Sequence, residues 1–259
     1  VCACMLVMRR RAPDAVRTST SAANAGSGSQ GYRALRVFLR NPTAMLGCGF
    51  LLAVLLLALT APWLFPGDPL DMVAQPFLWP GQDGTYLLGT DSMGRDVAAG
   101  IAHGARVSLL VGVSATLIGL SLGIGIGAVS GYFGGWVDDL LQRVVVLFQT
   151  IPSFILLVVL VAIAQPAIST IVVAIGLVTW PTVARLVRAE FRALRHKEFV
   201  LAARALGYSH SRIILREMLP NALPPIIVTS SVMVASAILL ESALSFMGMG
   251  DPNVVSWGS

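Results

Sequence analysis

Four long segments without a charged side chain are the feature of this sequence that most constrains its fold. The longest holds 41 residues between Arg143 and Arg185. The others lie between Arg40 and Asp68, between Arg106 and Asp138, and between Glu217 and Glu241. A helix that crosses the hydrocarbon core of a bilayer needs about 20 predominantly apolar residues. Each segment therefore predicts at least one membrane-spanning helix.

The longest segment is better explained by two spans than by one. A single helix of that length would be about 60 Å long, twice the thickness of the hydrocarbon core. Gln165-Pro166 provides a break, because proline does not continue a helix. We therefore predict an all-α, polytopic membrane protein with five helices, at about residues 44–65, 107–131, 140–164, 167–187 and 222–247.

Composition supports this class. Charged residues make up 12% of the chain, about half of what a soluble domain carries. A water-soluble enzyme or a nucleic-acid-binding protein is thereby excluded, although the net charge is +5. Cysteine adds little: Cys2-x-Cys4 lacks partner ligands for a metal site, and residues 66–105 contain no cysteine for a disulfide.

The distribution of charge predicts the orientation of the chain. Residues 1–43 carry seven arginines and one aspartate, and residues 184–221 carry eight basic and three acidic residues. Residues 66–105 carry five aspartates and one arginine. Basic segments stay in the cytoplasm, so we expect a cytoplasmic N-terminus, a cytoplasmic loop at 188–221 and an external segment at 66–105. Five crossings that start inside give the same arrangement.

The N-terminal region predicts a tail followed by a surface helix. Residues 12–31 are rich in Ala, Ser, Thr and Gly, and we expect residues 1–31 to form a disordered cytoplasmic tail. In residues 32–43, apolar side chains fall on one helical face and arginines on another. This favours a short elbow helix on the inner lipid surface. The alternative is a simple basic flank of the first span.

The second predicted span carries glycines at a spacing of four residues, which places them on one helical face. They are Gly119, Gly123, Gly127 and Gly131. Glycine at this spacing lets another helix backbone approach closely. The segment GIGIG (123–127) is not a dinucleotide-binding motif, because it lies inside an uncharged window and not at a strand-to-helix turn.

The cytoplasmic loop predicts two short helices. The stretch 198–207 suits a helix that stops at Gly207, a residue that favours the left-handed cap. Ser209 could cap a second helix that ends before Pro220. The two helices meet at Gly207-Tyr208. A basic, helical loop of this kind indicates docking to another protein, with contact to anionic lipid as the alternative.

Residues 198–220 resemble the cytoplasmic Glu-Ala-Ala loop of ATP-binding-cassette importer permeases. The positions that match in register are Ala202, Ala203, Gly207, Leu219 and Pro220. Leu201 and Glu217 stand where the pattern has Glu and Ile. The segments LLGTDSMGRDV (87–97), WPTVARLVRAE (180–190) and ESALSFMGMGDPNVVSWG (241–258) are similar to segments of dipeptide, oligopeptide and nickel permeases, of the C-type subunits in particular.

The resemblance implies a type I importer transmembrane domain with six spans, so one more helix is expected beyond Ser259. It also implies a bacterial inner-membrane location, a second, B-type permease subunit, two ATPase subunits that bind ATP and Mg²⁺, and an extracytoplasmic binding protein. The residues implied to couple to the ATPases are Ala202, Ala203, Gly207, Tyr208, Leu219 and Pro220. Small residues would let the loop helix fit a groove on the ATPase.

The residues themselves agree with a non-catalytic subunit without a cofactor of its own. No G-x-x-x-x-G-K-[ST] motif occurs, and the only lysine is Lys197. No cluster has metal-ligand spacing. Glu241 is a candidate intramembrane polar residue; alternatively it lies at the interface or bonds a neighbouring helix.

The expected function is ATP-driven import of dipeptides or oligopeptides. A permease for nickel or another small solute is the alternative within the family. An ATP-independent secondary transporter is a different class, which would show internal repeats and several intramembrane ionisable residues. A membrane scaffold is a third class, which would not need a glycine-lined span or a docking loop.

Overall fold

The computed structural model describes residue 36 and residues 38–259, and it divides the chain into two compact units, Val1–Ala53 and Val54–Ser259. The predicted tail at 1–31 and the beginning of the predicted elbow helix lie outside the described residues. Each unit is described by itself below.

In the first unit, residues 36 and 38–40 are helical, and the helix is broken at Asn41. Helix α2 (Pro42–Leu64) begins directly afterwards and continues into the second unit. The side-chain oxygen of Asn41 accepts hydrogen bonds from the backbone N–H groups of Thr43, at 3.2 Å, and Ala44, at 3.4 Å. Asn41 therefore caps α2 and separates it from the preceding helix.

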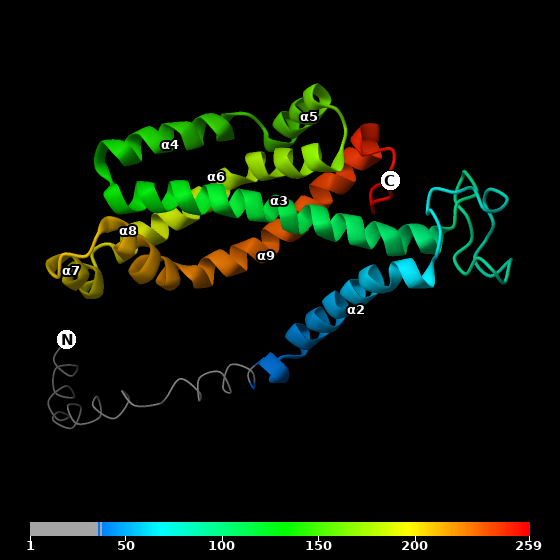
Figure 1. The fold of residues 1–259 in the computed structure, drawn as a ribbon, viewed down its shortest axis with the longest axis horizontal. Helices are drawn as coiled ribbons and strands as arrows, with labels where there is room; N and C mark the ends of the chain where they lie inside the picture. The colour runs from blue at the N-terminus through cyan, green and yellow to red at the C-terminus, as the bar shows by residue number, and fades with distance from the viewer. Residues whose placement is uncertain (1–35, 37) are drawn as a thin grey trace, which may run out of the picture. The chain divides into compact units, whose positions relative to one another are not determined.

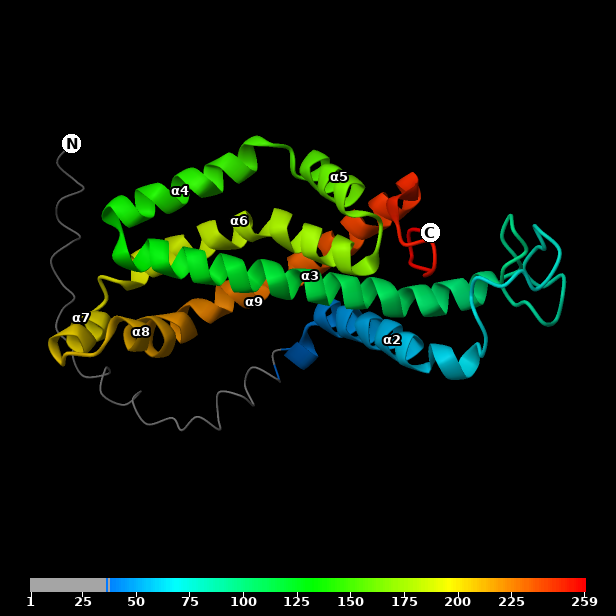
Figure 2. The same ribbon diagram turned by 45° about the horizontal axis from the view of Figure 1, so that its top comes forward.

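Three long helices form the core of the second unit, and they lie side by side (Figures 1 and 2). They are α3 (Val97–Phe133), α6 (Ile168–Leu194) and α9 (Leu219–Leu244). Helices α4 (Gly135–Thr150) and α5 (Ser153–Ala164) pack on α6. The remaining elements are α7 (Glu198–Ala205), α8 (His210–Arg212) and two π-helical segments, Ile213–Met218 and Ser245–Met249. No β-strand occurs in the described part of the chain.

The helix that contains the predicted second span, α3, begins ten residues before the predicted residue 107, at Val97. The carboxylate of Asp96 accepts a hydrogen bond of 2.9 Å from the N–H of Ala98 and caps the helix. The predicted start was set by the charge of Arg106, but a cap and not a charge fixes where a helix begins. The non-helical connection between α2 and α3 therefore ends at residue 96, and residues 97–105 of the predicted external segment are helical.

The third predicted span, 140–164, is not one straight helix. Helices α4 and α5 are bent by 81° at a short break, Ile151-Pro152. Proline removes a backbone donor and disfavours helical geometry in the residue before it. Among the described residues, four helices are long and apolar enough to cross a membrane, and five spans result when the bent pair is counted as one.

The prediction that the second loop helix ends before Pro220 is also wrong. The chain is helical from His210 through Met247, and the backbone leaves the helical region at Gly248, with φ +77°. A π-helical turn precedes Pro220, and the N–H of Leu219 bonds to the carbonyl of Ile214, five residues earlier. This wider turn accommodates the proline ring, so the helix continues into α9. Within the predicted cytoplasmic segment 188–221, helix α6 therefore extends to Leu194 and α9 begins at Leu219.

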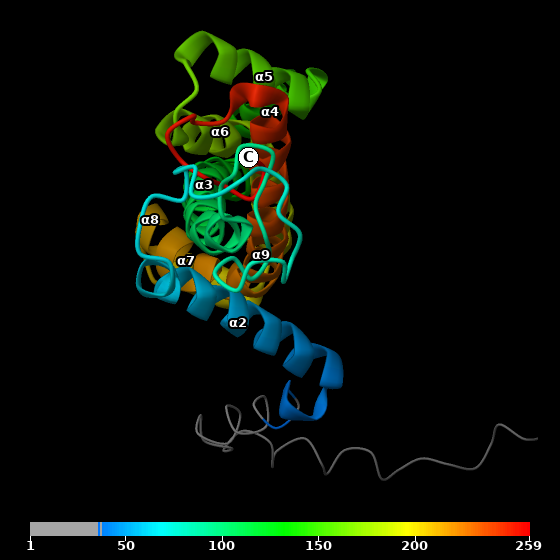
Figure 3. The same cartoon turned by 90° about the vertical axis from the view of Figure 1, so that its right-hand side faces the viewer.

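The elements of the second unit gather at two opposite ends. Figures 1 and 2 show the α3–α4 corner at the same end as α7 and α8. The segment 66–96, the turn between α5 and α6 and the tail after Met249 lie at the other end, which faces the viewer in Figure 3. This two-ended arrangement is what a membrane-spanning bundle requires.

Candidate functional site

The candidate site begins where α7 ends. Gly207 has φ +74°, in the left-handed region that glycine adopts without strain. Its N–H donates to the carbonyl of Arg204 at 3.0 Å, and the N–H of Tyr208 donates to the carbonyl of Ala203 at 3.1 Å. These two bonds form a Schellman cap. The glycine thereby stops α7 and turns the chain toward α8, whose N-cap residue is Ser209.

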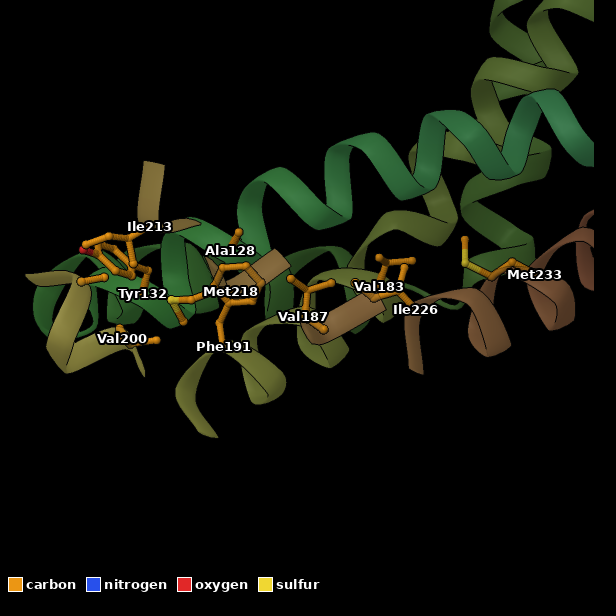
Figure 4. Close-up of a cluster of buried hydrophobic side chains, with 12 residues drawn as sticks. Ala128, Tyr132, Val183, Val187, Phe191, Val200, Ile213, Met218, Ile226 and Met233 are labelled. Carbon is orange, nitrogen blue, oxygen red and sulfur yellow. The ribbon is translucent and has the colours of Figure 1, made fainter. Parts of the chain in front are cut away.

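The α7–α8 element is held on the chain's own core. Val200 is fully buried on α7, and Ile213 and Met218, which follow α8, are at most 1% exposed. Figure 4 shows these side chains in one cluster with Tyr132 of α3 and Phe191 of α6. The element is therefore packed firmly against the ends of α3 and α6 and is not a loose connection.

The structure separates the two alanines of the predicted coupling set. Ala203 is 5% exposed and belongs to the buried cluster, whereas Ala202 is exposed. The expectation that both small side chains face a groove on a partner is therefore corrected for Ala203, which packs against its own chain. Leu219 is half-buried and Pro220 is exposed, both at the beginning of α9.

Polar and aromatic contacts attach the same element to α3. The hydroxyl of Tyr132 and Nδ1 of His210 share a hydrogen bond of 2.8 Å. The guanidinium of Arg204 lies 5.0 Å from the centre of the Tyr132 ring, and that of Arg212 lies 3.9 Å from the centre of the Tyr208 ring. Tyr132 itself is 4% exposed. It joins α7 and α8 to the last turn of α3.

The outer side of this element is apolar. We name as the docking face the exposed side chains Phe199, Leu201, Ala202 and Leu206. Leu206 is 73% exposed and Leu201 is 50% exposed. Large apolar side chains that project beside charged ones at the end of a bundle are typical of a protein–protein interface.

The four glycines of α3 lie against α6. A Cβ built on Gly123 would be 2.4 Å from the Cβ of Val183 and 2.9 Å from the carbonyl oxygen of Trp180. A Cβ on Gly127 would be 2.5 Å from the carbonyl oxygen of Ala184. Gly119 faces Thr179 and Gly176, and Gly131 faces Phe191 and Arg188. The stripe therefore brings the backbones of α3 and α6 together.

Glu241 is 3% exposed and accepts two hydrogen bonds. Ser245 donates to Oε1 at 2.8 Å, and Ser108 of α3 donates to Oε2 at 3.2 Å. The hydroxyl of Ser108 also accepts from the N–H of Trp257 at 3.2 Å. Glu241 thus bonds a neighbouring helix, as one of the two alternatives predicted, and the network fixes the tail that follows α9.

Sequence reasoning missed a buried ion pair at the α3–α4 corner. Asp138 is 6% exposed. It accepts from Nε of Arg188 at 2.5 Å, from Nη2 of Arg188 at 2.7 Å and from Ser130 at 2.5 Å. Arg192 lies 3.9 Å from the same carboxylate. The partners are fifty residues apart, and no spacing in the sequence pairs them.

No group of three or more His, Cys, Asp or Glu side chains that could hold a metal ion occurs among the residues that the structure describes.

Comparison with known proteins decides the family. Residues 123–256 match the model of the "binding-protein-dependent transport system inner membrane component", and residues 29–82 match the "N-terminal TM domain of oligopeptide transport permease C". This chain belongs to the family of binding-protein-dependent transport permeases. The resemblance to permeases of ATP-binding-cassette importers is thereby confirmed, and the chain is a multi-pass membrane protein.

Relatives of this permease include a putative peptide permease protein of Brucella suis biovar 1, which is 38% identical over 88% of this chain and 75% of the relative. The di/tripeptide transport system permease protein DppC of Pseudomonas aeruginosa is 36% identical over 86% of this chain and 75% of the relative. The oligopeptide transport system permease protein OppC of Haemophilus influenzae is 37% identical over 87% and 73%.

The permease also resembles a solved structure, the MetNI methionine ABC transporter in an inward-facing conformation. The match covers 60% of this chain and 77% of that chain, with 19% sequence identity and a TM-score of 0.51. At this identity the likeness concerns the fold alone, and it agrees with the predicted all-α type I importer fold.

Proposed function

We propose that this permease is the transmembrane subunit of an ATP-driven importer of dipeptides and oligopeptides. It would form half of the translocation path, and a second permease subunit would form the other half. The observation that carries the coupling part of this proposal is the α7–α8 element, which is fixed to its own core on one side and exposes an apolar docking face on the other.

The names of the relatives support the peptide substrate. The three described above are called a peptide, a di/tripeptide and an oligopeptide permease, and each aligns with most of this chain. The extracytoplasmic binding protein that such a system uses would deliver the peptide to the end that carries residues 66–96.

The assignment of ATP binding to other subunits follows from a missing sequence motif. The sequence holds no phosphate-binding loop of the G-x-x-x-x-G-K-[ST] type. ATP and Mg²⁺ would therefore bind to two partner ATPases, and this subunit would be non-catalytic. The α7–α8 end would face the cytoplasm of a bacterial cell, where the ATPases are, in agreement with the basic charge of residues 184–221.

Coupling would use the contacts described above. Closure of the ATPases on ATP would push on the docking face. Because Val200, Ala203 and Ile213 pack on α3 and α6, the push would move these helices as a unit. A bundle with two alternative arrangements then opens the path to one side at a time.

The test is reconstitution of the complete complex in proteoliposomes. We expect ATP-dependent uptake of dialanine that requires this permease, its partner permease, both ATPases and the binding protein. Uptake that continues without ATPases, driven by an ion gradient, would instead support a secondary transporter.

A further inference from the structure

A polar stripe runs along one side of α4 and is not used by any contact described above. We define the α4 stripe as Asp139, Gln142, Arg143, Val146 and Thr150. The spacings of three, four, seven and eleven residues from Asp139 place them on one helical face. The stripe extends over about 16 Å of the helix. Four of these five side chains are polar or charged, although α4 belongs to a bent helix pair that is apolar enough to cross a membrane.

The stripe is turned away from the chain's own bundle. Helix α4 buries Val145 completely and Asp138 almost completely. The ring of Phe148 also packs against Trp180 of α6, with 5.3 Å between the ring centres. At 3.6 residues per turn, the centre of the stripe lies about 120° from Val145. Four of the stripe residues, Asp139, Arg143, Val146 and Thr150, are accordingly exposed, and Gln142 is half-buried.

An open groove follows the stripe. It has a volume of about 510 Å³ and is lined by the stripe residues together with Leu147 and Arg188. The Arg188 guanidinium is already bound by Asp138 through two hydrogen bonds. The groove is thus formed by α4 and one side chain of α6, and its charge is set mainly by the stripe.

Asp139 and Arg143 supply two opposite charges in this groove. Both side chains are exposed, and neither forms an ion pair with another of the residues that the structure describes. Arg143 lies in the first turn of the predicted third span, 140–164. An ionisable side chain within a span is costly in lipid, so it reaches the interface or faces a water-filled cavity or a binding partner. The open groove beside Arg143 favours the cavity. The sequence analysis considered only Glu241 as a charge within a span.

We propose that the α4 stripe lines the translocation path and that Arg143 and Asp139 bind the carboxylate and the ammonium group of a passing zwitterionic peptide. This proposal rests on the proposed function and adds a site within it. One helical turn, about 6 Å along the axis, separates the two residues. The planar guanidinium matches a carboxylate with two parallel hydrogen bonds. The carboxylate of Asp139 accepts hydrogen bonds from an ammonium group.

The pairing of opposite charges argues for a zwitterion rather than for lipid. A site for anionic headgroups would carry arginine without a carboxylate one turn away. A short peptide, in contrast, carries both charges at its ends and loses water from both when it enters a narrow path. Gln142 adds an amide that donates to and accepts from the peptide backbone.

Cysteine labelling tests whether the stripe lines the path. Single cysteines at Arg143, Val146 and Thr150 are compared with controls at Leu140 and Val144, in a chain whose Cys2, Cys4 and Cys48 are replaced by serine. In the reconstituted complex, a charged, membrane-impermeant thiol reagent should modify the stripe positions and spare the controls. Dialanine delivered by its binding protein should slow the modification.

Two outcomes of the labelling would overturn the proposal. If the stripe cysteines fail to react, or crosslink to the second permease, the stripe is a covered subunit interface. If they react at a rate that dialanine does not change, the groove is wet but binds no peptide.

Transport by charge-neutralised variants tests the roles of the two residues. Arg143→Gln and Asp139→Asn should each lower dialanine uptake roughly tenfold, the effect of losing a hydrogen bond to a charged group. Assembly with the ATPases and ATP hydrolysis should persist. Arg106→Gln, an exposed arginine of α3 outside the stripe, is the matched control and should keep full uptake.

Unchanged uptake in both stripe variants would contradict the assigned roles. This result differs from a failure of the proposed function. If the proposed function is wrong, the unaltered complex takes up no dialanine with ATP, while the labelling pattern still reports whether the stripe is open to water.

Discussion

At the scale of single residues, two residues of the same type that lie close together in the sequence differ in burial. Ala203 is buried in the cluster that joins α7 to α3 and α6, while the adjacent Ala202 is exposed on the docking face. In the same way, Gly123 lies against the backbone of α6, whereas a Cβ on Gly125 would meet nothing within 4 Å. Each pair therefore offers a variant and its matched control.

Tryptophan at the two alanines should have opposite effects. Ala203→Trp overfills the buried cluster and should cost about 1–3 kcal/mol of the permease's folding stability. Ala202→Trp should leave stability unchanged and weaken ATPase binding, because its bulk projects from the docking face. Thermal unfolding in detergent and co-purification of the ATPases measure the two effects. Equal thermal stability of both variants would contradict the assigned burial.

Alanine at the two glycines should separate packing from helix propensity. Gly123→Ala forces α3 and α6 apart and should destabilise the permease by about 1–3 kcal/mol. Gly125→Ala should be neutral or stabilising by up to about 1 kcal/mol, because alanine favours the helix. Thermal unfolding of the purified protein checks this order, and a loss of stability in Gly125→Ala equal to that in Gly123→Ala would be evidence against close packing.

At the scale of elements, a few polar contacts decide how the helices are joined. Asp138 of α4 and Arg188 of α6 connect these two helices. Figure 1 shows the α3–α4 corner at the same end of the bundle as α7 and α8. The pair is held by two parallel hydrogen bonds, and Asp138 is almost fully buried. Removal of one partner leaves the other charge without compensation, which is more costly than removal of both.

A double-mutant cycle on this pair should give a coupling free energy of about 1–3 kcal/mol. Asp138→Asn and Arg188→Gln should each lower the unfolding temperature, and the double variant should be less destabilised than the sum of the two. Additive effects would mean that the pair does not join α4 to α6 in the membrane.

The order of the apolar segments could be predicted from the sequence, but several helix ends, and the division of one predicted span into two helices, could not. Uncharged windows locate the spans because burial in lipid excludes charge. They do not locate the cap at Asp96, the bend at Pro152 or the π-helical turn before Pro220, because those depend on hydrogen bonds of single residues. Gly207 was predictable, since a left-handed cap needs glycine locally. The burial of Ala203 was not, because it depends on helices distant in sequence.

At the scale of the whole molecule, the charge distribution and the fold agree on a chain with two chemically different ends. One end carries α7, α8 and most of the basic residues between 184 and 221. The other carries the segment 66–96, which holds five aspartates and one arginine. This polarity is the basis of the proposed orientation in the membrane.

Thiol labelling in intact cells should report that orientation. In a background without Cys2, Cys4 and Cys48, a cysteine at Ser92 should react with a membrane-impermeant reagent, and a cysteine at Ser29 should react only after the membrane is opened. Labelling of the Ser29 variant but not the Ser92 variant in intact cells would reverse the orientation.

The central claim is that the α7–α8 element couples this permease to its ATPases, and Gly207 tests it most directly. At φ +74°, valine would be strained by about 1–2 kcal/mol or more, whereas asparagine tolerates this region better. Apart from its chain neighbours, no atom lies within 4 Å of the added Cβ, so the strain acts on the cap and not through a clash.

The measurement is ATP-dependent dialanine uptake per ATP hydrolysed, in proteoliposomes that contain the full complex with Gly207→Val or Gly207→Asn. We expect the valine variant to insert normally but to lose ATPase binding or coupled uptake, and the asparagine variant to retain most of both. Full assembly and full coupled uptake in the valine variant would contradict the claim that this element is the coupling joint.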